Sequence, residues 1–564
     1  MERDVGKARA FDYIVIGAGS AGAVVASRLS EDPNVSVALL EAGGALRHPL
    51  IRMPLAFALV QRDPRFTWQW VSEPEPAMNG RTMDIVAGRG LGGSSSVNGL
   101  IYTRGNRLDY DLWCQSGLRG WGYADVLPYF KRLENSWRGE TRYHGGSGPI
   151  SVEQVGHTEF IDDIYDALEQ AAVAAGYPVS ADLHGDDVEG ISRIELSVDR
   201  GRRSSTARGY LDPARARPNL TIFTGANARK ILFAGRHAEG VEFVRGGRVE
   251  RLYCRNEVIL SAGTISSPHL LMLSGIGPAD HLREVGIEPI VDLPGVGQNL
   301  SDHPRLVMSW KAAHKRTLLR YLRWDRATLG VVRWAFTKGG PMSFNGAYSN
   351  HYIRTRAELA RADVQLVGLA IGIDAQPWFP AFTDQPIHRF SQLIYGLHPE
   401  SRGEITLQSS DPDRPPRLLC NLLSVPSDMD SMVAACRAAR GIYQKSPQAD
   451  LIAEEILPGP QAVTDEDLRA FIRQTATPGF HPVGTCQMSI GSQAVVDAEL
   501  KVRGVTGLRI ADASIFPDLP GGNINIPTIM VGEKAADMIR GRMLPPVDFE
   551  SVMEATANQI QFAK

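Results

Sequence analysis

The sequence predicts an α/β protein. A Rossmann-type dinucleotide-binding domain is joined to a second, α+β domain, in which an antiparallel sheet is flanked by helices. Two observations predict the first domain: an apolar run leading into Gly-X-Gly-X-X-Gly at residues 13–22, and a second apolar run ending in small residues at 257–263. A third observation predicts the second domain, because residues 306–475 contain runs that alternate between apolar and polar side chains. The 564 residues are too many for one core, which agrees with two domains.

The N-terminal motif carries the dinucleotide prediction. Residues 13–16 are expected to form a buried strand, residues 17–22 a turn into a helix that ends near residue 29, and residues 35–40 a second strand that stops at Glu41. In this pattern Gly17 allows the tight turn, Gly19 lets a pyrophosphate approach the backbone and Gly22 lets the helix pack on the strand. The helix N-terminus favours phosphate, and Glu41 can accept hydrogen bonds from both ribose hydroxyls, which favours an unphosphorylated ribose.

A second glycine-rich stretch occupies residues 87–99 and reads Ala-Gly-Arg-Gly-Leu-Gly-Gly-Ser-Ser-Ser-Val-Asn-Gly. Its backbone can lie against a flat or anionic ligand, with Ser94 and Asn98 offering side-chain hydrogen bonds. The alternative is an ordinary flexible loop. Such loops seldom combine this many glycines with apolar residues such as Leu91 and Val97, so a ligand-binding loop is favoured.

The remaining elements follow in order. Residues 45–80 are expected to be extended, and helices are expected at 109–116, 123–135 and 158–175. Strands are expected at 220–223, 230–233, 241–244 and 249–254, with a hairpin turn at Gly246-Gly247. The strand at 257–263 and the helix after it return to the Rossmann pattern, so the dinucleotide-binding domain is discontinuous. We assign it residues 1–150, 200–305 and 485–545.

The second domain is assigned residues 151–199 and 306–484, and residues 546–564 form a peripheral tail. Strands are expected at 364–369, 392–397 and 404–407, and flanking helices at 427–443 and 464–474. This domain is expected to cover the cofactor and to shape a substrate pocket.

Composition excludes several classes of function. The formal net charge of −3 gives no reason to expect nucleic acid as a partner. The five cysteines are scattered without a Cys-X-X-Cys pair, so neither a metal site nor a disulfide framework is expected, and a reducing cytoplasm fits best. No apolar run has the length of a membrane span.

Two C-terminal segments are candidates for the chemistry. His481 lies among glycine, proline and small residues at 480–486, although a lone histidine is more often structural than catalytic. Residues 510–514 then lead through Asp512 to Gly-Gly-Asn-Ile-Asn-Ile-Pro-Thr at 521–528 and a helix that continues to about residue 536. Pro527 suits the first turn of that helix, whose N-terminus favours an electron-rich group.

Together, these segments resemble the glucose–methanol–choline (GMC) family of FAD-dependent oxidoreductases. The resemblance covers nearly the whole chain. It rests on residues 17–41, 90–106, 261–277, 294–303, 401–412, 481–486 and 522–528.

The resemblance implies FAD as the cofactor and assigns roles residue by residue. The family's catalytic histidine corresponds to His481. Its second active-site position, histidine or asparagine in relatives, corresponds to Asn525, with Asn523 two residues away as the alternative. The FAD-binding residues that it implies are Gly17, Gly19, Ser20, Gly22, Glu41, Arg89, Gly92, Gly93, Ser94, Asn98, Ala228, Asp512 and Asn523.

The implied reaction is oxidation of a small-molecule alcohol to an aldehyde or ketone. Neutral imidazole can take the hydroxyl proton and an asparagine amide can hold the substrate oxygen. A dehydrogenase that uses a quinone or another acceptor is favoured, with an oxidase as the first alternative. A hydroxynitrile-type lyase and a light-driven decarboxylase are further alternatives on the same scaffold. Phe480 and the scarcity of acids favour an uncharged alcohol over choline.

The resemblance also bears on how FAD is attached. Some members bond the flavin to a histidine in the second glycine-rich loop, and the corresponding position here is Val97. We therefore expect FAD to be bound without a covalent link.

One further segment is basic and aromatic. Residues 311–338 contain a single acid, Asp325, among many Lys and Arg, with Tyr321, Trp324, Trp334 and Phe336 at nearly helical spacing. One interpretation is a solvated helix packed over the pocket by its aromatic residues. The other is a peripheral membrane contact on anionic lipid, where a quinone can be reached.

Overall fold

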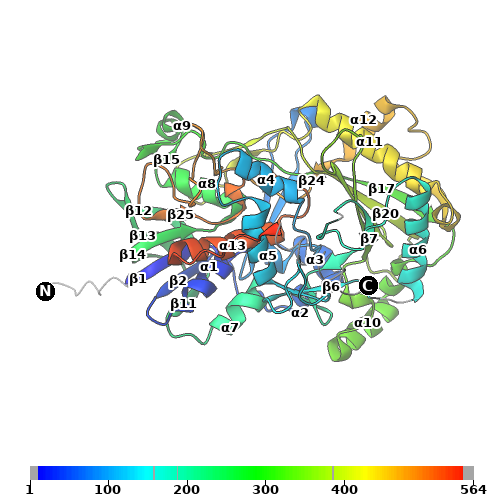
Figure 1. Ribbon diagram of the computed structural model, residues 1–564, viewed down its shortest axis with the longest axis horizontal. Coiled ribbons are helices and arrows are strands. Elements are labelled where there is room, and N and C mark those ends of the chain that lie inside the picture. Colours follow the sequence, from blue (N-terminus) through cyan, green and yellow to red (C-terminus); the bar gives the residue numbers. More distant parts are fainter. Residues whose placement is uncertain (1–9, 157–158, 187, 384–385, 550–564) are drawn as a thin grey trace.

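The computed structural model describes residues 10–156, 159–186, 188–383 and 386–549. Two large sheets lie at opposite ends of an elongated molecule, with helices α4 and α5 between them (Figure 1). No helix in these ranges is both long enough and apolar enough to cross a lipid bilayer.

The first sheet has the strand order β11-β2-β1-β14-β13-β12, with β25 beside β14. The predicted parallel arrangement is confirmed, because β1 lies between β2 and the C-terminal half of β14 and runs parallel to both. The strands are β1 (Ala10–Ile16), β2 (Val37–Glu41), β11 (Leu220–Thr224), β12 (Ala226–Ala234), β13 (His237–Arg245), β14 (Arg248–Leu260) and β25 (Leu508–Ile510).

Strand β14 differs from the sequence prediction of two separate strands. Its N-terminal half pairs antiparallel with β13 and its C-terminal half pairs parallel with β1 and β25. The polar residues Arg255 and Asn256 interrupt the apolar pattern, but the backbone continues through them. Gly246 and Gly247, with φ of 56° and 76°, form the predicted turn between β13 and β14.

Helices cover both faces of this sheet. Helices α1 (Gly22–Leu29) and α13 (Asn525–Arg540) pack closely, since a Cβ on Gly532 would stand 2.8 Å from the Ala21 carbonyl oxygen. Helix α5 (Tyr123–Leu133) is bound to α13 by ion pairs from Arg132 to Glu533 and Asp537, both at 2.7 Å. Helix α8 (Gly263–Leu273) follows β14, as the βα pattern predicts.

The second sheet has the order β23-β17-β20-β19-β18-β7, with β24 beside β17, and all of its pairs are antiparallel. Its strands are β7 (Gly190–Arg193), β17 (Pro304–Ala312), β18 (Ala347–Ile353), β19 (Val364–Leu369), β20 (Arg389–Gly396), β23 (Ile452–Leu457) and β24 (Thr477–Pro478).

Strands β19 and β20 are buried on both faces rather than on alternate residues. Helix α11 (Pro426–Tyr443) covers one face, where a Cβ on Gly396 would meet the Met432 sulfur at 3.1 Å. The other face points into a cavity, which Val367 and Leu393 line. The helix predicted at 464–474 is α12 (Asp465–Thr475).

Two further local predictions are wrong. Residues 404–407 do not join the large sheet, because β21 (Glu404–Thr406) pairs only with β22 (Arg417–Leu419) among the described strands. Residues 45–80 are not simply extended, since they contain α2 (Pro49–Arg52) and α3 (Phe57–Gln61) before β3 (Thr67–Val71) pairs with β4 (Asp84–Gly88). Pro49 begins α2, in the first-turn position that proline favours.

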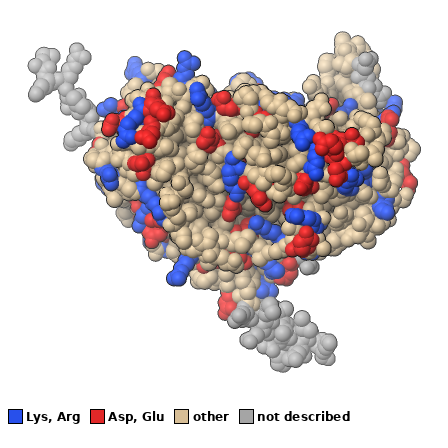
Figure 2. Space-filling model, turned by 90° about the horizontal axis from the view of Figure 1, so that it is seen from above, with Lys and Arg blue, Asp and Glu red and all other residues tan. Residues whose placement is uncertain are grey.

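The remaining elements connect these layers. Lys and Arg are interspersed with Asp and Glu over the face shown in Figure 2, which agrees with the small net charge. The helices are α4 (Arg107–Gln115), α6 (Glu159–Ala174), α7 (Asp212–Ala214), α9 (Ala279–Glu284) and α10 (Trp324–Thr337), and the short strands are β5 (Glu134–Ser136), β6 (Ile150–Gln154), β8 (Glu195–Leu196), β9 (Val198–Asp199), β10 (Arg202–Arg203), β15 (Ile276–Gly277) and β16 (Val291–Asp292).

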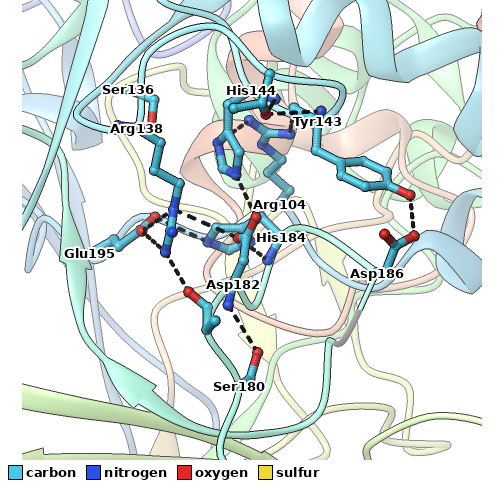
Figure 3. Close-up of polar contacts among 12 residues, drawn as sticks. Arg104, Ser136, Arg138, Tyr143, His144, Ser180, Asp182, His184, Asp186 and Glu195 are labelled. Carbon is cyan, nitrogen blue, oxygen red and sulfur yellow. Dashed lines mark hydrogen bonds and ion pairs between the residues drawn. The ribbon is translucent and has the colours of Figure 1, made fainter. Parts of the chain in front are cut away.

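A buried charge network ties Arg104, just after the second glycine-rich stretch, to residues 134–195 (Figure 3). Arg104 forms a 2.6 Å ion pair with Glu134, and both side chains are at most 1% exposed. His144 bridges this pair to Asp182, with Nδ1 3.1 Å from Glu134 and Nε2 2.9 Å from Asp182. Because each buried charge has a partner of opposite sign or a hydrogen bond, the network holds this region together.

Candidate active site

A cavity of about 850 Å³ lies between the two sheets and is lined from both. Most of the predicted site residues line it, although Gly22, Arg89 and Gly92 are absent from its described lining. The predicted residues that line it are Gly17, Gly19, Ser20, Glu41, Gly93, Ser94, Asn98, Ala228, His481, Asp512, Asn523 and Asn525.

The first glycine turn has the geometry that its sequence predicts. Gly17 has a φ of 97°, which favours glycine, and a Cβ on Gly22 would lie 1.9 Å from the Gly17 carbonyl oxygen. Gly22 therefore serves the packing of helix on strand rather than the cavity surface. At Gly19, no described atom lies within 4 Å of where a Cβ would stand, so its backbone is open to a ligand.

The second glycine-rich loop docks on the first. The Gly92 N–H donates to the Ala18 carbonyl at 2.8 Å, and a Cβ on Gly93 would lie 2.7 Å from the Gly19 Cα. The two loops thus form one cradle in which no side chain separates their backbones. Ser94 Oγ accepts the Gly88 N–H at 3.1 Å.

Two arginines support this cradle. Arg89 lies over the Trp68 ring at 4.6 Å, and its charge favours ionised Glu41 nearby. Arg203, which sequence reasoning missed, is 3% exposed and donates to Asn98 Oδ1 at 2.7 Å and to the Ile51 carbonyl at 2.9 Å. Burial lowers the pKa of Arg203 to about 9. In the sequence, Arg203 follows Arg202, and two adjacent arginines are typical of an exposed segment, so no local signal marks Arg203 as buried.

The acids of the nucleotide half are held by backbone groups. Glu41 is 7% exposed and accepts the N–H groups of Ala18 at 3.0 Å and Gly43 at 2.8 Å. Burial raises the pKa of Glu41, while these N–H groups oppose that rise. A carboxylate has about four acceptor sites, so Glu41 can still accept ribose hydroxyls.

Asp512 lies at the start of α8. It accepts the N–H groups of Gly263 at 2.9 Å and Ser514 at 2.8 Å, and the Ser267 hydroxyl at 2.6 Å. Burial raises the pKa of Asp512, and these donors offset part of the rise. Asp512 thus fixes the edge of the cavity between α8 and the segment before α13.

The two candidate asparagines have different partners. Asn523 Nδ2 lies 2.9 Å from His481 Nε2, whereas Asn525 Oδ1 accepts the Ser20 hydroxyl at 2.8 Å. Asn525 begins α13 and therefore points toward the first glycine turn. The structure thus places Asn523, and not Asn525, beside the candidate catalytic histidine.

The hydrogen bonds around His481 determine which of its nitrogens carries hydrogen. The Leu397 carbonyl can only accept, so His303 Nε2, 3.0 Å away, must donate to it. In neutral imidazole the other nitrogen is then an acceptor, so His303 Nδ1 accepts from His481 Nδ1 at 3.0 Å. His481 Nε2 is left with a lone pair, which agrees with the donating amide of Asn523.

Burial keeps His481 neutral. Its pKa is well below the ordinary value, first because of burial and then because of His303 and the positive charge of Arg305. The backbone N–H of His481 donates to the Asp302 carboxylate at 2.9 Å, and the backbone N–H of Gly479 donates to it at 3.2 Å. Burial raises the pKa of Asp302 to about 7. The loop that carries His481 is therefore held at both backbone and ring.

The cavity wall near His481 is mainly apolar. Arg305 lies over the Phe480 ring at 4.9 Å, and both residues line the cavity. Among the described lining residues, the acids Asp84 and Asp413 are exposed, and Glu41 and Asp512 belong to the nucleotide half. Apolar and aromatic lining residues include Leu55, Phe57, Val367, Leu369, Leu393 and Tyr395.

Comparison with known proteins gives a consistent result. Two GMC oxidoreductase family models match the chain, the N-terminal one over residues 11–305 and the C-terminal one over residues 399–532. The chain is 42% identical to oxygen-dependent choline dehydrogenase of Escherichia coli (strain K12), over 95% of this chain and 96% of that protein.

Solved structures agree with this. Pyridoxine 4-oxidase from Mesorbium loti is similar with a TM-score of 0.84 and 28% identity, over 94% of this chain and 99% of that one. A formate oxidase variant from Aspergillus oryzae RIB40 is similar with a TM-score of 0.88 and 27% identity, over 94% of this chain and 98% of that one.

Proposed function

The chain belongs to the GMC oxidoreductase family, and we propose that it oxidises an uncharged alcohol to an aldehyde or ketone and passes the electrons to an acceptor other than oxygen. The observation that carries the proposal is the hydrogen-bond chain from the Leu397 carbonyl through His303 to His481. This chain leaves a neutral imidazole with a lone pair on Nε2 at the cavity, as a general base requires.

FAD is the cofactor of this family, and the residues present fit it. The open backbone at Gly19 and the contact between Gly92 and Ala18 provide the cradle for its phosphates. Glu41 would hold the adenosine ribose, and Ala228 would meet the adenine. When bound, FAD supplies the two-electron acceptor for the hydride that leaves the alcohol carbon.

The protein's own part is to bind, orient and deprotonate the alcohol. The Asn523 amide lies 2.9 Å from His481 Nε2 and donates to it. A bound alcohol would take the place of that contact, so that Nε2 accepts the hydroxyl proton and the amide donates to the substrate oxygen. As His481 becomes positive, the lone pair of His303 Nδ1 continues to accept its Nδ1–H and stabilises that charge. The start of α13 adds the positive end of a helix dipole to the cavity.

The cavity wall supports an uncharged substrate. A quaternary ammonium group is usually bound by aromatic faces or by a carboxylate. Here Arg305 covers the Phe480 ring and adds positive charge near His481, which disfavours a cation at that position. Apolar side chains such as Leu369 and Leu393 favour a substrate with an aliphatic or aromatic body.

Anaerobic titration of the purified flavoprotein tests the proposal. Primary aliphatic and aromatic alcohols are expected to bleach the flavin absorbance at lower concentration than choline does. A flavin that stays oxidised with every alcohol, while a hydroxynitrile is cleaved, would indicate a lyase instead. Preferential bleaching by choline would contradict the proposed substrate class.

An alcohol oxidase is the second candidate, because both solved relatives described above carry the name oxidase. The two functions differ in the fate of the electrons. Hydrogen peroxide formed in proportion to the alcohol oxidised in air would identify an oxidase. Slow reoxidation in air together with fast reoxidation by a soluble quinone would support the dehydrogenase.

A further inference from the structure

Helix α10 projects from the second domain at the lower edge of Figure 1. Few of its residues are buried, so a narrow stripe attaches it. Gly330 and Trp334 are its buried residues, and Ala327 is partly buried. The Trp334 indole N–H donates to the Gly201 carbonyl at 2.7 Å, and a Cβ on Gly330 would meet the Met342 methyl at 2.9 Å. Most of the other residues of the helix are exposed.

The outward face of α10 is apolar. Leu329, Val332 and Phe336 are 69%, 48% and 86% exposed. Their spacing of three and four residues places them on one face of the helix, opposite the attachment stripe. A surface helix of a water-soluble domain normally presents polar residues there, so this arrangement is inverted.

The apolar surface continues beyond the helix. Trp324 is 46% exposed, and its ring stacks on Phe379 at 6.2 Å and on Phe382 at 5.6 Å. Phe382 is itself 72% exposed. We call Trp324, Leu329, Val332, Phe336 and Phe382 together the α10 surface.

Positive charge borders this surface. Arg326 and Arg333 are exposed on α10, at one border of the apolar face. The single acid of the helix, Asp325, forms a 2.6 Å ion pair with Arg323, so its charge is offset. Two further acids are also paired, Asp374 with Arg389 at 3.4 Å and Glu454 with Lys311 at 2.9 Å. Further basic residues of the same segment are Lys315, Arg316, Arg320 and Lys338.

The α10 surface adjoins the cavity. Leu322, just before α10, lines the cavity together with Ile373 and Pro377. The backbone of Trp378 connects these residues to the helix. Its N–H donates to the Leu322 carbonyl at 3.1 Å, and its carbonyl accepts the backbone N–H of Trp324 at 3.0 Å. One segment therefore forms part of both the cavity wall and the α10 surface.

We propose that the α10 surface docks on a lipid bilayer that contains anionic lipid. Its aromatic and aliphatic side chains enter the interface, and the bordering arginines contact the headgroups. A large apolar area with a basic border matches such a bilayer better than it matches a neutral protein surface. If the proposed function holds, docking also brings the cavity close to lipophilic alcohols and lipid-soluble acceptors. The docking itself does not depend on that function.

Sedimentation of the FAD-loaded protein with vesicles tests the proposal. Vesicles of equal parts phosphatidylcholine and phosphatidylglycerol are compared with pure phosphatidylcholine at low salt. The protein is expected to sediment with the mixed vesicles, and about 0.5 M NaCl is expected to weaken binding by screening the headgroup charge. Protein that stays in the supernatant with both vesicles would overturn the proposal.

Matched variants locate the surface. Leu329→Ser with Phe336→Ser is expected to reduce partitioning by about tenfold or more, because both side chains enter the bilayer. Arg326→Gln and Arg333→Gln are expected to reduce it about fivefold each at low salt. The control is Val249→Ser with Ile490→Ser, which removes residues that are 64% and 66% exposed elsewhere, and it should bind like the unaltered protein.

Two outcomes would overturn the assignment. An equal loss of vesicle binding in the control variant would show that any exposed apolar residue contributes to binding, wherever it lies on the protein. A dimer in solution that Phe336→Ser converts to a monomer, without any vesicle binding, would make the α10 surface an interface between two copies of the chain. Flavin bleaching by alcohol in the absence of vesicles is measured separately, so failure of docking is distinguishable from failure of the proposed function.

Discussion

His303 and His481 face each other through their Nδ1 atoms, which lie 3.0 Å apart. Two such nitrogens can share a hydrogen bond only if one carries a hydrogen and the other does not. Because His303 Nε2 is committed to the Leu397 carbonyl, the hydrogen belongs to His481. A histidine that need not touch the substrate thus determines which nitrogen of His481 is the base.

The His303→Phe variant tests this positioning role. It removes the acceptor for His481 Nδ1–H, so the ring can turn or change tautomer. We expect FAD to stay bound, kcat to fall about tenfold to a hundredfold and KM to change little, because a misplaced reacting group acts mainly on the chemical step. His303→Gln, whose amide oxygen can accept, should recover part of the rate. Equal losses in both variants would contradict the role.

Asn523→Ala and Asn525→Ala should separate the two asparagines. Asn523 contacts His481, so its loss should lower the rate of flavin reduction by about a hundredfold with FAD retained. Asn525 contacts Ser20 of the glycine turn, so its loss should mainly weaken FAD binding. Stopped-flow reduction and FAD titration of each apoprotein check this. Slow flavin reduction in Asn525→Ala, together with weak FAD binding in Asn523→Ala, would instead make Asn525 the second active-site residue.

Glu134→Gln should destabilise the protein, because Glu134 is the buried partner of both Arg104 and His144. Burial opposes the charge of Glu134, but Arg104 and His144 more than offset it, and its pKa is lowered from 4.5 to about 2. Leaving Arg104 buried without its partner should cost about 3 to 5 kcal/mol at pH 7. Denaturant unfolding measures the loss. The exposed pair of Lys501 with Glu499 provides the control, and Glu499→Gln should cost little.

The same variant gives a pH test with a defined sign. A carboxyl whose pKa is lowered on folding contributes stability above its ordinary pKa and loses that contribution as pH falls through the folded value. The stability difference between the unaltered protein and Glu134→Gln should therefore be full above pH 4.5 and shrink as the pH falls toward 2. A difference that is the same at all pH values would contradict the ionic account.

FAD should be released by acid without a covalent remnant. The position at which some relatives bond the flavin is Val97, which is 3% exposed and packs with Ile51 and Val60. An aliphatic side chain offers no nucleophile. Acid precipitation of the purified protein should leave a colourless pellet and a yellow supernatant. Flavin fluorescence that stays in the washed pellet would show the expectation wrong.

Local patterns predicted the parts of the fold that depend on near neighbours in the chain. The β1 turn into α1 and the strand β19 follow from apolar runs and glycine spacing. The pattern failed at β14, where Arg255 and Asn256 are polar within a continuous strand. It failed again at β21, where the alternation is real but the pairing is with β22 only, among the described strands.

In the candidate site, too, the sequence predicted what depends on near neighbours in the chain and missed what depends on distant contacts. His481 stood out because of the residues around it, yet the partner that determines its tautomer lies 178 residues earlier in the chain. No local signal reveals that contact, because it is formed by packing between the segment just before β17 and the loop after β24. The choice between Asn523 and Asn525 depends on where α13 begins, and a difference of two residues is within the error of any sequence-based helix boundary.

The most direct test of the central claim is the rate of anaerobic flavin reduction by an alcohol substrate in His481→Ala. The matched control is His237→Ala, which removes an exposed histidine of the first sheet. The variant should bind FAD with an unchanged spectrum, and its reduction rate should fall by about two to four orders of magnitude, as the loss of a general base predicts. Reduction of His481→Ala at the rate of the control would contradict the assignment of His481 as the base.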